Sequence, residues 1–252
     1  MAEMLDQVVS INRTKNGPKK LEIVLSKVGR GKSLTLINKS YKRYKEKSLY
    51  ISLEDSLQNV FRKFNALKAM DGNKRRIPRK MKKAFKKQFG INFVFMHRGI
   101  VGIHSPASVF SRQELLEKIK ELIEFHNPDR IYLDSFNLYY TYSTEIIGEK
   151  NLFLFQRKRA ALEEVLSLGV PVVTSMQANR SVMMGSNEPI NVNDYLENIK
   201  GQIDRGEIVV TNSRIEGGEL IEKDLITHKE EVIVDMDVFS DKMRELYLQD
   251  FS

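Results

Sequence analysis

Eight consecutive residues have the types and the spacing of a phosphate-binding loop. They are Ser26, Lys27, Val28, Gly29, Arg30, Gly31, Lys32 and Ser33. Gly31, Lys32 and Ser33 match the end of the pattern G-x-x-x-x-G-K-[ST], and Ser26 stands where the first glycine would be. In such a loop backbone amides surround the phosphates, and the positive end of the following helix faces them. The loop predicts that Lys32 reaches the β- and γ-phosphates of ATP and that the Ser33 hydroxyl binds Mg²⁺. The alternative is a chance Gly-Lys-Ser in a lysine-rich chain.

Two carboxylates follow predicted strands and could complete this site. Asp134 ends the apolar segment 130–134, and Glu54 follows the segment 48–53. Parallel strands place their carboxyl ends at one edge of the sheet, where open α/β folds bind ligands. Asp134 is therefore a candidate to hold Mg²⁺, and Glu54 to orient or deprotonate the attacking water. Taken alone, Asp134 is equally an ordinary strand-end aspartate. Asp55 could replace Glu54, and Asp55 or Ser56 could simply cap the next helix.

Gln177 directly follows the predicted strand 169–175. An amide at a strand tip beside the phosphate loop could sense the γ-phosphate and pass that signal to the loop after it. Its simpler interpretation is a solvated loop glutamine.

Apolar segments with strand and helix periodicity alternate along the chain, which predicts an α/β fold with a mostly parallel, twisted sheet and helices on both faces. The predicted strands are 20–25, 48–53, 91–95, 130–134 and 169–175, and the predicted helices include 57–67, 111–126, 150–168 and 240–248. A loop with Gly99, Gly102 and Pro106 is expected after the strand 91–95. Strands at 207–211, 220–225 and 231–234 are joined by turns, which predicts antiparallel strands at the C-terminal edge. We expect a single domain over 1–252, with an extension at 1–19 and a basic insertion at 71–90.

Composition narrows the class of protein. A chain of 252 residues with 41% hydrophobic residues can bury one substantial core. It contains no cysteine and four histidines, which disfavours disulfides and histidine- or thiolate-built metal centres. We find no signal peptide and no apolar run long enough to span a bilayer, so we expect a cytoplasmic protein without a membrane partner. A net charge of +8 favours a polyanionic partner.

The charge is most concentrated in residues 71–90, which contain nine Lys or Arg and one acid. Met81, Phe85 and Phe89 fall at helical spacing, which indicates a cationic amphipathic helix. Such a helix would contact nucleic-acid phosphates without reading sequence. The alternatives are a solvated face or a docking site for an acidic protein. The predicted nucleic-acid contacts are Lys74, Arg75, Arg76, Arg79, Lys80, Lys82, Lys83, Lys86 and Lys87. Three tyrosines could stack on bases or pack against a neighbouring subunit: Tyr139, Tyr140 and Tyr142.

In their order along the chain, these segments resemble the RecA-like ATPase domain of DnaB-type replicative helicases, phage versions included. The matching segments are 28–33, 49–54 with Ser56, 131–134 and 170–181, with weaker matches over 194–210 and 210–218. The resemblance implies a RecA-like fold with ATP and Mg²⁺ as cofactors. It implies that Lys32 and Ser33 bind phosphate and metal, that Glu54 activates water and that Asp134 holds Mg²⁺.

The same resemblance implies an assembly that acts on DNA. Gln177 would couple the γ-phosphate to a DNA-binding loop that begins at Arg180, and Arg214 would enter the neighbouring subunit's site as an arginine finger. The implied partners are single-stranded DNA, further copies of the chain in a hexamer, and replication or recombination proteins. The implied location is the cytoplasm of a bacterium or of a phage-infected host.

Three features depart from the family's pattern. Asn212 stands where the family carries a lysine two residues before the finger arginine, residues 181–188 contain no basic residue, and no room precedes residue 20 for the family's collar domain. Three hypotheses therefore stand: a DNA-translocating motor or helicase, a RecA-family ATPase that does not unwind, such as a recombinase-like filament former or a helicase loader, and a nucleotide-controlled assembly switch.

Overall fold

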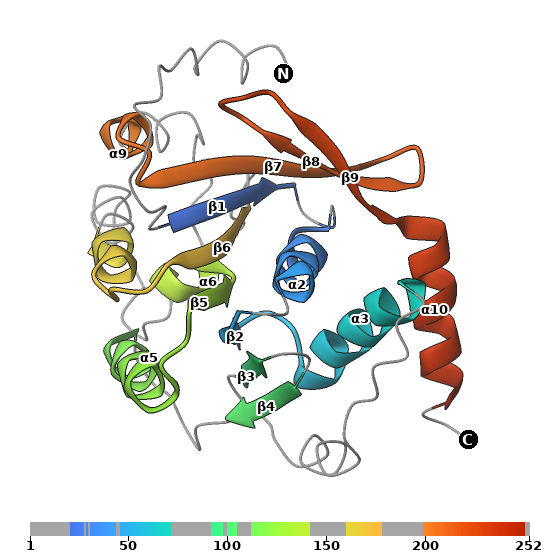
Figure 1. The fold of residues 1–252 in the computed structure, drawn as a ribbon, viewed down its shortest axis with the longest axis horizontal. Coiled ribbons are helices and arrows are strands. Elements are labelled where there is room, and N and C mark those ends of the chain that lie inside the picture. Colours follow the sequence, from blue (N-terminus) through green and yellow to red (C-terminus); the bar gives the residue numbers. More distant parts are fainter. Residues whose placement is uncertain are drawn as a thin grey trace, which may run out of the picture.

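Nine strands of the described chain form one sheet, which runs through the molecule (Figure 1). The computed structural model describes residues 21–27, 29, 31–43, 46–71, 92–97, 100–104, 112–141, 160–177 and 199–249. The strands are β1 (Leu21–Ser26), β2 (Ser48–Ser52), β3 (Asn92–His97), β4 (Ile100–His104), β5 (Arg130–Asp134), β6 (Val172–Gln177), β7 (Ile208–Glu216), β8 (Glu219–Asp224) and β9 (Glu230–Asp235). The helices are α2 (Lys32–Lys42), α3 (Leu57–Met70), α5 (Arg112–His126), α6 (Phe136–Thr141), α9 (Lys200–Asp204) and α10 (Met236–Gln249).

The strand order confirms the predicted fold class. The sheet runs β4-β3-β2-β5-β6-β1-β7-β8-β9, and its five central strands from β2 to β7 are parallel. β8 and β9 add antiparallel strands at the C-terminal edge, as predicted. The result is an α/β arrangement in which β5 and β6 lie between β1, the strand that leads into the phosphate loop, and β2.

The opposite edge of the sheet differs from the sequence prediction. The segment around Gly99 and Gly102, predicted as a loop, contains β4, which pairs antiparallel with β3, and β3 in turn pairs antiparallel with β2. The β-branched residues Ile100, Val101 and Ile103 favour a strand there. Gly102 was a misleading signal because it is accommodated within the strand, opposite Phe95.

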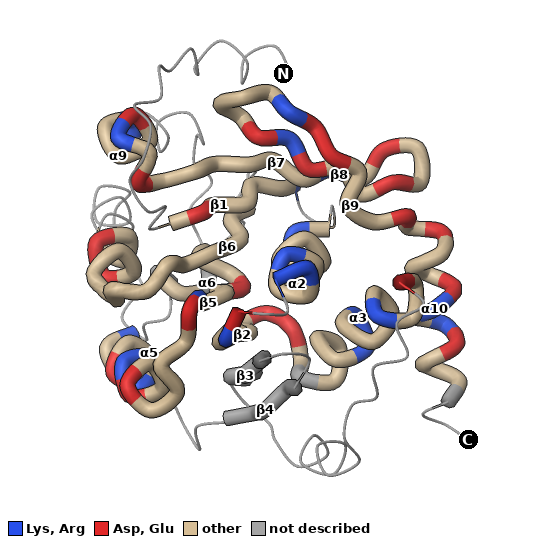
Figure 2. The backbone as a smooth tube through the Cα atoms, in the orientation of Figure 1, with Lys and Arg blue, Asp and Glu red and all other residues tan. Residues whose placement is uncertain are grey.

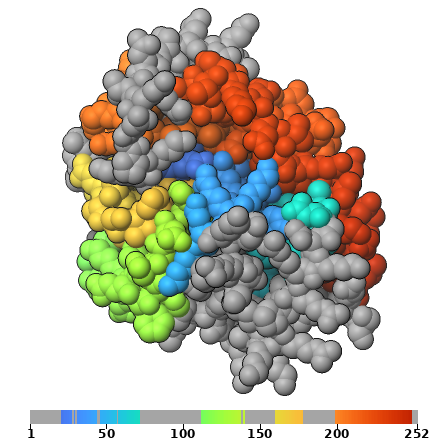
Figure 3. Space-filling view, in the orientation of Figure 1, coloured from blue at the N-terminus to red at the C-terminus, as the bar shows by residue number. Residues whose placement is uncertain are grey.

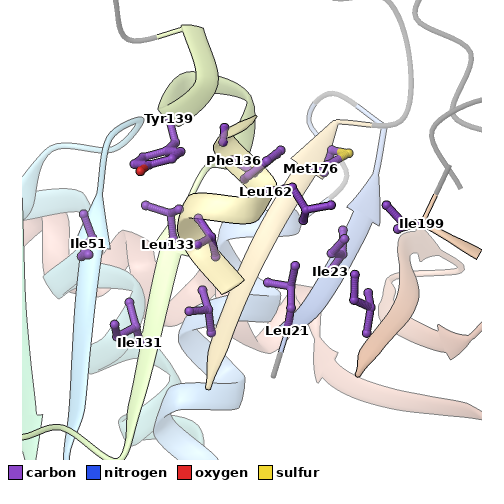
Figure 4. Close-up of a cluster of buried hydrophobic side chains, with 14 of the residues drawn as sticks. Leu21, Ile23, Ile51, Ile131, Leu133, Phe136, Tyr139, Leu162, Met176 and Ile199 are labelled. Atoms are coloured by element: carbon purple, nitrogen blue, oxygen red, sulfur yellow. The ribbon is translucent and has the colours of Figure 1, made fainter. Parts of the chain in front are cut away.

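Helices cover both faces of the sheet and enclose two apolar clusters. We call the two sides the α2 face, which is covered by α2, α3 and α10, and the α5 face, which is covered by α5, α6, residues 160–166 and α9. Figure 4 shows the cluster on the α5 face, where Ile131, Leu133, Leu21 and Ile23 of the strands lie in one cluster with Phe136 and Leu162. Since side chains alternate along a strand, each central strand contributes to both clusters.

Some element boundaries differ from those predicted. β6 extends to Gln177, so this residue ends the strand instead of following it. α10 begins at Met236, ahead of the predicted residue 240, because Asp235 accepts hydrogen bonds from the amides of Asp237 and Val238, both at 3.0 Å. Of the predicted helix 150–168, residues 160–168 are described; residues 160–166 are helical, and 167–168 form a turn. Within the described chain, no helix has the length and apolar content needed to cross a membrane.

Candidate functional site

The predicted phosphate loop connects the end of β1 to the start of α2. Gly29 and Gly31 have φ of 70° and 91°, a left-handed conformation that glycine adopts without strain. Lys32 is the first residue of α2, and no acidic residue lies in the first turn of this helix. The positive end of the helix is therefore free to attract an anion. Of the eight predicted loop residues, Val28 and Arg30 lie outside the described residues.

The loop packs against β8, which pairs antiparallel with β7; we call β7 and β8 the C-terminal hairpin. A Cβ placed on Gly31 would lie 2.5 Å from Cδ1 of Leu220, which is a fully buried residue of β8. Gly31 therefore needs to be glycine both for its backbone conformation and for this close approach. This contact could not be predicted from local sequence, because β8 is far from the loop along the chain.

Glu54 lies beside the loop, where the sequence predicts it. Its carboxylate forms an ion pair with Nζ of Lys32. The Lys32 side chain is 9% exposed, and that of Glu54 is 40% exposed. Glu54 can therefore be reached by solvent, as a group that orients a water molecule must be. In Figure 3 the N-terminal part of the described chain, in blue, lies between the orange and red C-terminal elements and the green and yellow middle of the chain.

The two residues after Glu54 have structural roles. Asp55 forms an ion pair with Lys63 of α3, and its backbone closes a turn with the Ser52 hydroxyl. Ser56 caps α3 by accepting a hydrogen bond from the amide of Asn59 at 3.3 Å. The capping role considered for Ser56 is thus confirmed, and Asp55 is bound to Lys63 of α3.

Asp134 is a fully buried carboxylate at the end of β5. Oδ2 accepts a hydrogen bond from the Tyr50 hydroxyl at 3.1 Å, and Oδ1 accepts one from the Ser175 hydroxyl at 2.6 Å. Burial raises the pKa of Asp134, and the charge of Lys32 and the hydroxyls of Ser175 and Ser33 act against that rise. Asp134 therefore lies next to both Lys32 and Ser33.

The oxygen donors at this site suit Mg²⁺. Ser33 offers a hydroxyl and Asp134 a carboxylate, and Mg²⁺ is typically held by one or two carboxylates together with substrate phosphates and water. Among the described residues, no three His, Asp or Glu side chains are grouped so that they alone could hold a metal ion. Ser33 and Asp134 thus fit a Mg²⁺ ion whose remaining ligands come from ATP and water.

Gln177 lies at the same edge of the sheet. It pairs in register with Ser26, the first residue of the loop. Its backbone N–H donates a hydrogen bond to Oδ1 of Asn137 on α6 at 2.8 Å. The last residue of β6 is thereby fixed next to the phosphate loop. A role in sensing the γ-phosphate stays a prediction.

Arg214 lies on β7, on the side of the C-terminal hairpin that faces away from α2. Its guanidinium is paired with Glu216 at 2.8 Å and with Glu230 at 3.1 Å, and its side chain is 34% exposed. The hydrogen bonds that Arg214 donates to Glu230 and Glu216 raise the pKa of Arg214, so the guanidinium is charged. Its role as an arginine finger stays a prediction, and any such role requires exchanging these carboxylates for phosphate.

An ion-pair cluster not anticipated from the sequence ties α2 to the sheet. Nζ of Lys39 lies 2.7 Å from Glu22 of β1 and 2.6 Å from Glu222 of β8. Burial lowers the pKa of Lys39, but the two carboxylates more than offset this, so its pKa is raised overall. Figure 2 shows basic residues on α2 and acidic residues on the strands at the C-terminal edge of the sheet. We call Glu22, Lys39 and Glu222 the α2 clamp.

One predicted surface role is wrong. Tyr139 is fully buried on the α5 face, where its ring stacks on Phe136 and its hydroxyl donates to Glu164 at 2.9 Å. Because α6 folds back against the sheet, Tyr139 can neither stack on bases nor contact another subunit. The side chains of Tyr140 and Tyr142, the nine basic residues predicted to contact nucleic acid, and Arg180 lie outside the described residues.

No protein-family model matches the chain, and no curated protein matches it. Among solved structures, the chain is similar to a KaiC-like protein from the hyperthermophilic archaeon Pyrococcus horikoshii. The two share 12% sequence identity with a TM-score of 0.41, over 84% of this chain and 86% of that one. Function must therefore be inferred from the residues of the site.

Proposed function

We propose that this protein is a Mg²⁺-dependent ATPase. One observation carries the proposal: Lys32 and Ser33, at the start of α2, lie beside the carboxylates of Glu54 and Asp134 at the carboxyl edge of one parallel sheet. A phosphate loop, a metal-binding oxygen pair and an acid that solvent can reach are the parts that phosphoryl transfer to water requires.

Each residue has a role that follows from its position. Lys32 would exchange Glu54 for the phosphates of ATP, where its charge stabilises the negative charge of the transferring group. Glu54, released from Lys32, would orient the attacking water and accept its proton. Mg²⁺ held by Ser33 and Asp134 would neutralise charge on the phosphate oxygens. Gln177, at the end of the neighbouring strand β6, would respond to the γ-phosphate.

Two substitutions test the ATPase. Lys32→Ala should abolish ATP binding and hydrolysis, whereas Glu54→Gln should retain binding and lower turnover by about 10²–10⁴-fold, the usual contribution of a general base. Phosphate release measures turnover, and a fluorescent ATP analogue measures binding. Lys118→Ala is the matched control, because Lys118 pairs with Glu121 on α5, away from the site. Wild-type turnover in Glu54→Gln would contradict the assignment.

We propose further that hydrolysis drives movement on, or unwinding of, DNA by an assembly of this chain. The support is the net charge of +8, the basic segment 71–90 and the resemblance to DnaB-type helicases. Single-stranded DNA should then stimulate ATP hydrolysis by the assembled protein, and the stimulation should weaken with salt. Equal rates with and without DNA at every salt concentration would reject the motor function.

The absence of basic residues from 181–188 and the presence of Asn212 favour a second candidate, a RecA-family ATPase that does not unwind. A recombinase-like protein or a helicase loader would bind ATP and DNA without separating strands. A strand-displacement assay on the isolated protein distinguishes the two. If ATP serves only as an assembly switch, Glu54→Gln should leave the function intact, whereas either motor-type function should be lost.

A further inference from the structure

Each carboxylate oxygen of Asp134 accepts a hydrogen bond from a neutral hydroxyl group. We propose that Tyr50 and Ser175 are positioning residues that hold Asp134 in the orientation it needs to bind Mg²⁺. This inference rests on the proposed ATPase function and extends it to two residues of the neighbouring strands.

The geometry comes from three adjacent strands. β5, which ends at Asp134, runs between β2, which carries Tyr50, and β6, which carries Ser175. All three residues are fully buried on the α2 face. Tyr50 donates to Oδ2 at 3.1 Å and Ser175 to Oδ1 at 2.6 Å, so each carboxylate oxygen is held by a different strand. With both oxygens held, the carboxylate cannot rotate freely about its bond to Cβ.

Neutral donors suit this task better than cations. A carboxylate buried without hydrogen bonds is strongly destabilised, so some donor is required. A lysine or arginine would satisfy the carboxylate but also neutralise it and compete with the metal, whereas a hydroxyl leaves the negative charge in place. Burial and the neighbouring Asp134 raise the pKa of Tyr50 well above its ordinary value, so its hydroxyl keeps the proton that it donates.

Tyr50 is itself held rigidly. Its ring stacks on Tyr132 of β5, with centroids 6.2 Å apart and planes 15° apart, and both rings lie in the apolar cluster beneath α2. A donor on a fixed ring restricts the carboxylate more than a donor on a flexible chain would. Groups that orient a metal ligand in this way usually affect metal affinity or activity by about 10–100-fold when they are removed.

Tyr50→Phe tests the inference because it removes one hydroxyl and keeps the ring. The affinity of the full chain for a fluorescent ATP analogue would be measured in EDTA and across a Mg²⁺ titration. We expect unchanged affinity in EDTA and a Mg²⁺ requirement raised about 10-fold or more. Tyr132→Phe is the control, since it removes the hydroxyl of the stacked partner, and its Mg²⁺ requirement should match the wild type. Equal effects of the two variants, or no effect of Tyr50→Phe, would overturn the inference.

Two further variants separate positioning from packing. Ser175→Ala removes the other donor and should raise the Mg²⁺ requirement in the same direction. In an Asp134→Asn background, Tyr50→Phe should have little additional effect, because the carboxylate it orients is gone. Full additivity of the two substitutions would contradict the proposed coupling. If the wild-type protein binds the analogue equally with and without Mg²⁺, the proposed function itself fails, whereas a normal wild-type response with an unaffected Tyr50→Phe refutes only the positioning role.

Discussion

The two faces of the central sheet are built from alternate residues of the same strands, yet they differ in chemistry. On β1, β2, β5 and β6 the α5 face is largely apolar, with Leu21, Ile23, Leu25, Leu49, Ile51, Ile131, Leu133, Val172 and Met176. The α2 face of those strands mixes apolar residues with buried polar ones, among them Glu22, Ser26, Ser52, Asp134 and Ser175.

The difference shows how one set of strands serves stability and chemistry together. Leu133 and Asp134 are sequence neighbours, but Leu133 packs in the apolar cluster whereas Asp134 lies among hydroxyl groups beside the phosphate loop. A buried polar group costs free energy unless it is hydrogen-bonded. On the α2 face that cost is offset locally, by Tyr50 and Ser175 at Asp134 and by the α2 clamp at Glu22. Substitutions on the two faces should therefore separate into effects on folding and effects on turnover.

Asp134→Asn should have the largest effect of the substitutions, and it should lower the rate of ATP hydrolysis without lowering stability. A metal ion stabilises phosphoryl transfer by several kcal/mol, so losing its carboxylate should lower Mg²⁺-dependent hydrolysis by about 100-fold or more. Asn can still hydrogen-bond to Tyr50 and Ser175, so the unfolding midpoint should stay within about 3 °C of the wild type, roughly 1 kcal/mol for a chain of this size. Phosphate release and thermal unfolding measure the two effects. Unfolding at a much lower temperature would place Asp134 among the structural residues instead.

Leu133→Ala should produce the reverse pattern. Removing a buried leucine from the α5 face should cost about 2–5 kcal/mol of unfolding free energy, because it leaves a cavity in a packed cluster. Denaturant unfolding measures this cost. ATP binding per folded molecule, measured at low temperature, should be nearly unchanged. If the folded variant no longer binds ATP, the α5 face contributes to nucleotide binding as well as to stability, which would contradict the proposed difference between the faces.

Gly31→Ala should weaken nucleotide binding by a smaller amount. Its left-handed backbone and the approach of Leu220 both oppose a Cβ, at a cost of about 1–3 kcal/mol for the backbone alone. Gly29→Ala is the control, because it meets the backbone penalty but no atom within 4 Å. If the contact with Leu220 matters, Leu220→Ala should partly restore binding to Gly31→Ala and not to Gly29→Ala.

The smallest expected effect is a pH dependence of stability that comes from the α2 clamp. The pKa of Lys39 is raised in the folded protein above its ordinary value of 10.5. Its contribution to stability is therefore fully present below that value and is lost as the pH rises through the folded-state pKa. Denaturant unfolding between neutral pH and about pH 11 should show a loss for the wild type that is smaller in Lys39→Met. Identical pH profiles would show that the clamp does not titrate in this range.

The parts of the site that local sequence could predict are those that depend on a few neighbouring residues. The phosphate loop, Glu54 and Asp134 each follow an apolar segment, and parallel strands bring such ends together whatever their exact register. The alternation of strands and helices likewise predicted the fold class. β4 was missed because Gly102 suggested a loop, although its neighbours favour a strand.

The remaining contacts depend on pairings between distant segments. Tyr50 meets Asp134 only because β2 and β5 pair with Ser52 opposite Asp134, and a shift of one residue would turn Tyr50 to the other face. Leu220 meets Gly31, and Glu222 meets Lys39, only because β8 is joined to the sheet through β7. Nothing in the local sequence of any of these residues specifies its partner. Tyr139 was misjudged for the same reason, since its burial depends on the packing of α6.

The strand β7 is longer than the part of it that pairs with β1, so its C-terminal end extends beyond that pairing. Its first part, from Ile208 to Asn212, pairs with β1, whereas Ser213 to Glu216 lie beyond the last pair with β1 and pair with β8. Arg214 lies two residues past the last pair with β1, about 7 Å along the strand. Leu220 of β8, the strand that pairs with this end of β7, packs against Gly31, and the next residue, Ile221, pairs with Arg214. The phosphate loop and Arg214 are therefore connected through two consecutive residues of β8.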